Sequence, residues 1–162
     1  MTEMISNGQD EEWAIALEVF DRIATHLLKQ GERAAEAIDS DGFGPCMYRT
    51  STGLRCAVGG IIDDASYDPL IEGVGINGCM PLDGAWAPRQ YRSLGHGEQL
   101  QASAALLARV LNESKIPASK AVLRVLVTTQ SIHDCHRPES WKHVLDQNRL
   151  ELVRNLSSLV VV

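Results

Sequence analysis

Apolar residues recur at helical spacing near both ends of this chain but not through its middle, and this division limits the folds open to it. The first apolar stripe repeats every three or four residues and consists of Trp13, Leu17, Phe20, Ala24 and Leu27. Such a repeat places its members on one face of a helix. Asp10 is a suitable N-cap and Gly31 a suitable end, so the sequence predicts a helix over residues 10–30.

Three further helical patterns follow between residues 97 and 156. They predict helices from about Gly97 to Asn112, from about Ser119 onward, and from Pro138 to the end of this helical part. Short connections join these segments, and helices joined in this way usually pack as antiparallel neighbours. The C-terminal part is therefore expected to form an antiparallel bundle.

The middle of the chain predicts a small β-hairpin followed by loops. In CMYRTSTGLRCAVGG, residues 46–60, two short apolar-leaning runs flank a Ser-Thr-Gly turn. Seven glycines and three prolines between Gly59 and Gly95 then indicate a loop-rich insert over residues 61–96, with a helical turn entered at Asp68-Pro69. We predict a single domain over residues 1–162 in the mainly α (α+β) class, with the helices around the hairpin.

Composition narrows the class of protein. No apolar run approaches the roughly 20 residues of a membrane-spanning helix, and the acidic start MTEMISNGQDEEW does not resemble a secretion signal. We therefore expect a cytoplasmic protein whose four cysteines are thiols. A net charge of -6 disfavours broad nucleic-acid binding. The apolar ending LSSLVVV predicts a covered surface, and with it a homo-oligomer.

Several segments resemble a family of small bacteriophage and prophage proteins. They are HLLKQG, the stretch CMYRTSTGLRCAVGGIIDDASYDPLIEG and, much later, QSIHDCHRPESWKHVL, which follow the family's order over about two thirds of the chain. The chain departs from the family where Ile61 and Ile62 lead into Asp63 and Asp64, and in the longer insert from Gly75 to Gly97. The resemblance implies a phage accessory role, with host-cell cytoplasm as its location, but it carries over no catalytic residues.

Reactive side chains are concentrated in the predicted hairpin and in the HDCH run at residues 133–136. Zinc favours thiolate and imidazole ligands, which here would come from Cys46, Cys56, Cys135 and His133 or His136. The close pairs typical of zinc sites are missing from the sequence, so we expect no cofactor and keep zinc as the alternative. A cysteine nucleophile activated by His133 is disfavoured, because neighbouring side chains on a helix point about 100° apart and Asp134 should not orient His133.

A ligand pocket is the third chemistry. Arginine offers a planar fork of donors for phosphate or carboxylate, and glycine lets backbone amides approach a ligand. Since alternate residues of a strand face opposite sides, Tyr48 and Arg49 should diverge, and Arg49 could instead pair with Asp63 or Asp64. We expect the hairpin and the imidazole-carboxylate helix end to meet in one cavity. The candidate ligand-binding residues are Tyr48, Arg49, Arg55, Cys56, Gly59, Gly60, Gln130, His133 and Asp134.

Two classes of function remain open from the sequence. The first is a non-catalytic phage accessory protein that binds and neutralises a host factor, which would be either a host defence protein or a signalling nucleotide that it sequesters. The second is a small cytoplasmic hydrolase of a nucleotide or related phosphate ligand, with His133, Asp134 and the hairpin cysteines at its centre. The phage resemblance favours the first, with support from the acidic charge, the apolar ending and the lack of a recognisable catalytic set, whereas the density of reactive side chains in the hairpin keeps the second open.

Overall fold

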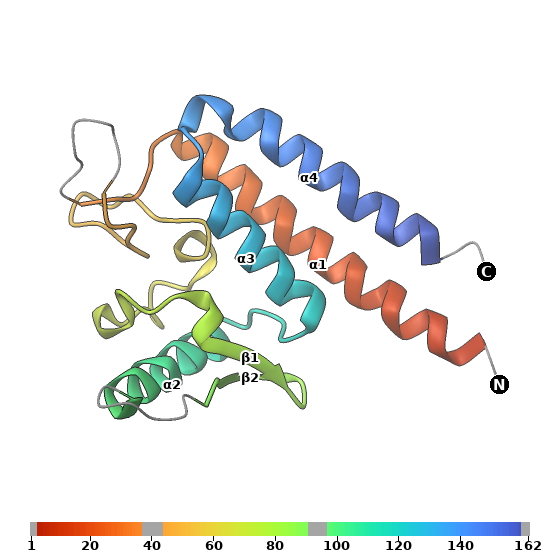
Figure 1. Cartoon of the computed structure of the whole chain (residues 1–162), viewed down its shortest axis with the longest axis horizontal. Coiled ribbons are helices and arrows are strands. Elements are labelled where there is room, and N and C mark those ends of the chain that lie inside the picture. The colour runs from red at the N-terminus through yellow and green to blue at the C-terminus, as the bar shows by residue number, and fades with distance from the viewer. Residues whose placement is uncertain (1–2, 37–43, 91–96, 160–162) are drawn as a thin grey trace.

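The computed structural model describes residues 3–36, 44–90 and 97–159, with side chains over 8–36, 44–90 and 97–155. The described chain is mainly α with one small sheet, which confirms the predicted class (Figure 1). The helices are α1 (Glu3–Gln30), α2 (Gly97–Glu113), α3 (Lys120–Cys135) and α4 (Pro138–Leu159). The strands are β1 (Cys79–Leu82) and β2 (Ala85–Pro88), and three 3-10 turns are η1 (Gly59–Ile61), η2 (Pro69–Ile71) and η3 (Ile76–Gly78).

Helices α1, α3 and α4 lie side by side and enclose the main core (Figure 1). Phe20, Ile23 and Leu27 of α1 are fully buried there. The predicted stripe on α1 is therefore correct at Phe20 and Leu27, whereas Trp13, Leu17 and Ala24 at its margin are only partly buried. Gly31 ends the helix with a positive φ, as predicted. The predicted start at Asp10 is wrong, because the helix continues back to Glu3.

The sequence had suggested that all C-terminal helices form one bundle, but helix α2 does not join α3 and α4 in it. It packs instead against the β1–β2 hairpin and against η2 (Figure 1). Trp86 of β2 fixes this arrangement, since its indole N–H donates to the Ile116 carbonyl at 2.8 Å. The Asn112 side chain also binds the backbone N–H and C=O of Trp86, at 2.8 and 2.9 Å. These bonds explain how an insert rich in glycine and proline acquires order.

The regular hairpin lies in the predicted loop region, and its predicted place at 46–60 is wrong. Asp83 and Gly84 join β1 to β2 with φ of 50° and 80°, the positive angles that a type I′ turn requires. Asp-Gly between two apolar stretches is a strong hairpin signal that the density of glycine and proline obscured. Residues 46–60 do turn back on themselves, but among described residues Arg49 and Arg55 form only an isolated antiparallel bridge.

The segment 44–58, called the ribbon below, is irregular because side chains bind much of its backbone. Gln30 accepts from the Arg55 N–H and donates to the Arg55 C=O, both at 2.9 Å. His26 lies 3.1 Å from the same carbonyl and donates to it through Nε2. Glu72 accepts from the N–H groups of Tyr48 and Arg49 at 2.9 and 3.0 Å. The end of α1 and the loop after η2 thus hold the ribbon in place without a sheet.

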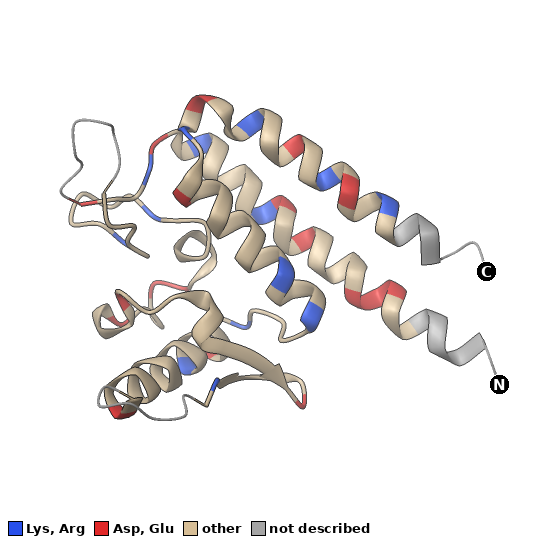
Figure 2. Ribbon diagram, viewed as in Figure 1, with Lys and Arg blue, Asp and Glu red and all other residues tan. Residues whose placement is uncertain are grey.

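Acidic and basic positions alternate along α4, whereas along α1 the acidic positions come first and the basic ones lie toward its C-terminal end (Figure 2). None of the helices in the described residues combines the length and apolar character needed to cross a bilayer. The side chains of the LSSLVVV ending, residues 156–162, lie outside the described ones. The homo-oligomer expected from that ending therefore stays a prediction.

Candidate functional site

The ribbon meets the C-terminal end of α3 at His133, which is fully buried. The Ala34 N–H donates to His133 Nε2 at 3.0 Å, so that nitrogen carries the lone pair and the ring proton lies on Nδ1. Nδ1 in turn lies 2.8 Å from Asp134 Oδ1 and donates to it. These two hydrogen bonds thus fix the neutral imidazole in the tautomer that carries its proton on Nδ1. The Trp141 ring, 5.5 Å away between centroids, covers the imidazole.

The prediction that Asp134 could not orient His133 is wrong. About 100° separates the Cα–Cβ directions of successive helical residues, but the imidazole and the carboxylate both extend beyond Cβ. Their rotamers bring Nδ1 and Oδ1 together at 2.8 Å. Gln130, one helical turn earlier, donates to the same Oδ1 at 2.7 Å. The end of α3 therefore presents a carboxylate held by two side chains of its own helix.

A cavity of about 180 Å³ opens where this carboxylate faces the ribbon. Cys46, Met47, Tyr48 and Cys56 of the ribbon line one part, Gln130 and Asp134 of α3 another, and the loop and turn at Gly73, Val74, Gly75 and Ile76 the rest. Tyr48 is anchored there by its hydroxyl, which donates to the Val74 carbonyl at 2.6 Å. The ribbon and the Asp134 carboxylate thus meet in one cavity, as predicted, but the expected lining residues Arg49 and His133 are not part of it.

The electrostatics of the cavity keep the thiols protonated and the carboxylate charged. Burial, reinforced by the Asp134 carboxylate, raises the pKa of Cys46 to about 12. Burial likewise raises the pKa of Cys56 to about 12. For Asp134, burial would raise the pKa, but hydrogen bonds from His133, Cys46 and Gln130 outweigh it and lower the pKa below its usual value. Near neutral pH the cavity therefore holds one negative charge and two thiols.

Cys46, His133 and Asp134 are also the residues that could best hold a metal ion, since their ligand atoms lie within 4.8 Å of one another. The hydrogen bonds of His133 do not suit that role. Nε2 already accepts from Ala34, and Nδ1 carries the proton donated to Asp134. Because a metal needs a free imidazole lone pair, binding through His133 would require one of these hydrogen bonds to break. Cys56, Cys135 and His136, the other expected zinc ligands, are not part of this group of described residues.

Five of the predicted site residues do not line the cavity: Arg49, Arg55, Gly59, Gly60 and His133, whose ring is buried behind Asp134. Arg49 and Arg55 both bind Asp64 Oδ1 at 2.9 Å, the ion pair anticipated for Arg49. Gly59 and Gly60 serve close packing instead. A Cβ on Gly59 would lie 2.0 Å from the Tyr48 carbonyl oxygen, and one on Gly60 would lie 2.2 Å from the His26 ring. Tyr48 and Arg49 do diverge, which explains why only the tyrosine reaches the cavity.

Sequence reasoning missed the contribution of residues 73–76 and of Glu72. Their Gly-Val-Gly-Ile sequence reads as a plain loop, and nothing in its spacing places it against α3. Glu72 was not among the predicted site residues, but it accepts from the ribbon backbone and from the Tyr67 hydroxyl. A carboxylate that binds distant backbone N–H groups leaves no local sequence signal.

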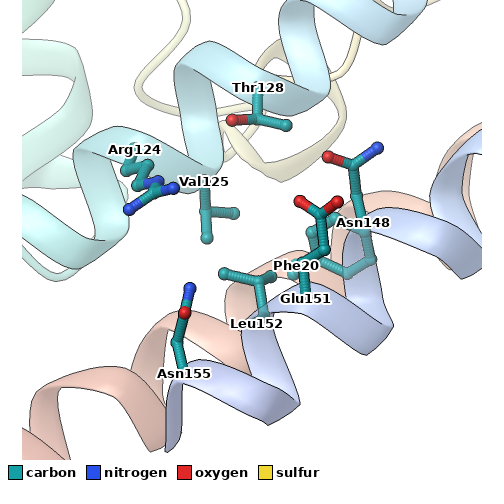
Figure 3. Close-up of a pocket in the computed structure, with 8 residues that line it drawn as sticks. All are labelled: Phe20, Arg124, Val125, Thr128, Asn148, Glu151, Leu152 and Asn155. Atoms are coloured by element: carbon teal, nitrogen blue, oxygen red, sulfur yellow. The ribbon is translucent and has the colours of Figure 1, made fainter.

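Two other hollows are less suited to a ligand. One of about 40 Å³ lies between α3 and α4 over Phe20, where polar side chains such as Arg124, Asn148 and Glu151 face one another (Figure 3). It has room for a few water molecules. The other is a shallow depression of about 730 Å³ beside α1 and Gly60, lined by charges of both signs. Of these three, the cavity at Asp134 is the one whose lining joins a single charged residue to apolar walls.

Comparison of the chain with protein-family models, with curated proteins and with solved structures finds no match.

Proposed function

We propose that this protein is a non-catalytic phage accessory protein that binds and neutralises a host factor in the host cytoplasm. The observation that carries the proposal is the state of the His133–Asp134–Cys46 cluster. Both ring nitrogens of His133 are engaged, so the imidazole has no lone pair for a substrate proton. Burial and the Asp134 carboxylate raise the pKa of Cys46 to about 12. Near neutral pH the sulfur is therefore a thiol, whereas a cysteine nucleophile has to be a thiolate. Such groups hold a shape and a charge but do not transfer protons.

The cavity favours a host protein over a nucleotide as the factor bound. At about 180 Å³ it is smaller than the roughly 300 Å³ at which pockets for drug-sized ligands begin. Its charged lining residue is Asp134, which would repel phosphate. The arginines expected to bind phosphate are occupied by Asp64. A host defence protein is therefore the leading partner, and a sequestered nucleotide is the second.

Two measurements test this function. Incubation with a panel of nucleotides, followed by heat denaturation and chromatography, should return every ligand intact. Capture from host lysate should retain a partner on the wild-type protein and on Asp146→Asn, a matched change on the exposed face of α4, but not on Asp134→Asn. Product that forms with the wild-type chain and not with Asp134→Asn would establish the hydrolase instead.

A further inference from the structure

The cavity at Asp134 has an unusual balance of surfaces. Apolar walls come from Met47, Val74 and Ile76, and the ring of Tyr48 adds to them. Asp134 is the charged residue among those that line it, and no lysine, arginine or histidine does so within the described residues. A ligand that enters must therefore satisfy a negative charge and cover apolar surface. That combination excludes phosphates and carboxylates and disfavours a bare inorganic ion.

Asp134 keeps capacity for a further donor. An ionised carboxylate offers about four acceptor positions. His133 and Gln130 both donate to Oδ1, and the Cys46 thiol supplies a third hydrogen bond. Arg33, whose positive charge acts on Cys46, is buried and donates to the His136 carbonyl, and it does not line the cavity. The side chain of Asp134 is 36% exposed, so the cavity can be reached from solvent.

From this geometry we propose that the cavity binds a primary ammonium group on a short alkyl stem. The ammonium donates to Asp134, and the stem lies along Met47, Val74 and Ile76. The group could belong to a free small amine or to a lysine side chain of a partner protein. The inference rests on the proposed binding function, since it names the chemistry through which the site would recognise its partner.

The first test uses the full-length protein and three ligands of nearly one shape, n-butylammonium, 1-butanol and butyrate. Backbone amide NMR shifts should move at the cavity residues with butylammonium, with a dissociation constant on the order of 1 mM for so small a ligand. Butanol should bind at least several-fold more weakly, and butyrate should not bind. Equal binding of butyrate and butylammonium, or no binding of the amine up to 50-fold above that concentration (about 50 mM), overturns the proposal.

Two variants locate the site. Asp134→Asn keeps an oxygen that can accept from His133 and should lower butylammonium affinity about tenfold or more, whereas Asp146→Asn should leave it unchanged. Gly75→Leu should also lower affinity, because Gly75 lines the cavity in an extended conformation and, its chain neighbours aside, no described atom lies within 4 Å of the place a Cβ would take. Full affinity in both Asp134→Asn and Gly75→Leu would place the amine elsewhere and refute the proposal.

A third arm separates the two sources of the ammonium group. Gly-Lys-Gly with blocked ends is compared with the same peptide carrying acetyl-lysine. Lysine-dependent binding tighter than butylammonium assigns the cavity to a protein side chain, and binding of the free amine alone assigns it to a small amine. If neither binds while partner capture still depends on Asp134, this inference fails and the proposed function stands. If the amine binds and nucleotides are hydrolysed, this inference stands and the proposed non-catalytic function fails.

Discussion

Replacing Glu72 by alanine should destabilise the protein more than any comparable change on its surface. The Glu72 carboxylate accepts three hydrogen bonds, from the Tyr48 N–H at 2.9 Å, the Arg49 N–H at 3.0 Å and the Tyr67 hydroxyl at 2.7 Å. Among described residues no strand pairs with the ribbon at these two N–H groups, so alanine leaves them with water as the only substitute. The ribbon would lose its main contact with the loop after η2.

The size of the loss follows from the number and type of these bonds. A hydrogen bond to a charged group contributes about 1.5–3 kcal/mol net. Three such bonds set an upper range, and water that reaches the partly buried donors recovers some of it, so about 3–5 kcal/mol of unfolding free energy should be lost. For a chain of this length that corresponds to a fall in Tm of about 10 °C. Glu72→Gln should lose somewhat less, because its amide keeps one acceptor oxygen.

Urea unfolding followed by circular dichroism measures this loss directly. Glu113→Ala is the matched control, since its pair with Arg109 at 3.6 Å is half exposed on both sides. That control should change the free energy of unfolding by about 0.5 kcal/mol or less. A Glu72→Ala variant that is no less stable than Glu113→Ala would show that the ribbon is not held through this carboxylate.

Three further predictions concern pH and packing. The pKa of Asp134 is lowered in the folded protein, so the stability that its charge contributes is complete above the unfolded pKa near 4 and is lost as pH falls through the folded pKa. The free energy of urea unfolding of Asp134→Asn should therefore approach that of wild type at pH 3, and a difference between the two proteins that is as large at pH 3 as at pH 7 would be contrary evidence. Gly59→Ala should unfold at a markedly lower urea concentration than wild type, because its Cβ meets the Tyr48 backbone, whereas Gly75→Ala should leave the urea midpoint nearly unchanged. Equal urea midpoints for the two variants would argue against this packing. Burial raises the pKa of Cys56 to about 12, so as pH rises the thiol loses its proton in the unfolded chain before it does in the folded one. The free energy of unfolding should therefore fall between about pH 9 and pH 12, and it should fall less steeply in Cys56→Ala.

Local signals predicted the helices well because they act within a few residues. Gly31 ends α1 with a positive φ, and Ser119 caps α3 by accepting from the Val122 N–H at 3.1 Å. Pro69 begins η2 as expected, with the Asp68 side chain as its cap. Each of these depends on the residue itself and its near neighbours. The start of α1 was missed because Asp10 is a good cap that the chain does not use.

The site could be predicted only in part, because it depends on contacts between distant segments. The convergence of Cys56, Tyr48 and Asp134 was expected from their chemistry, and they do line one cavity. The placement of Arg49 was decided by Asp64, a competing partner close by in the chain. Glu72 replaced a strand as the partner of the ribbon, and no periodic pattern encodes such a substitution. The irregular backbone of the ribbon and the shape of the cavity therefore could not be predicted from the sequence.

Alkylation of the thiols in the native protein tests most directly whether the Cys46–His133–Asp134 cluster is non-catalytic, with Cys46 as a protonated thiol. At pH 8, iodoacetamide followed by mass spectrometry should modify the exposed Cys135 and leave Cys46 largely unmodified until urea unfolds the chain. Burial and the Asp134 carboxylate raise the pKa of Cys46 to about 12, which keeps the thiolate rare. Cys46 that is alkylated in the folded protein as fast as Cys135 would contradict a protonated, non-catalytic site.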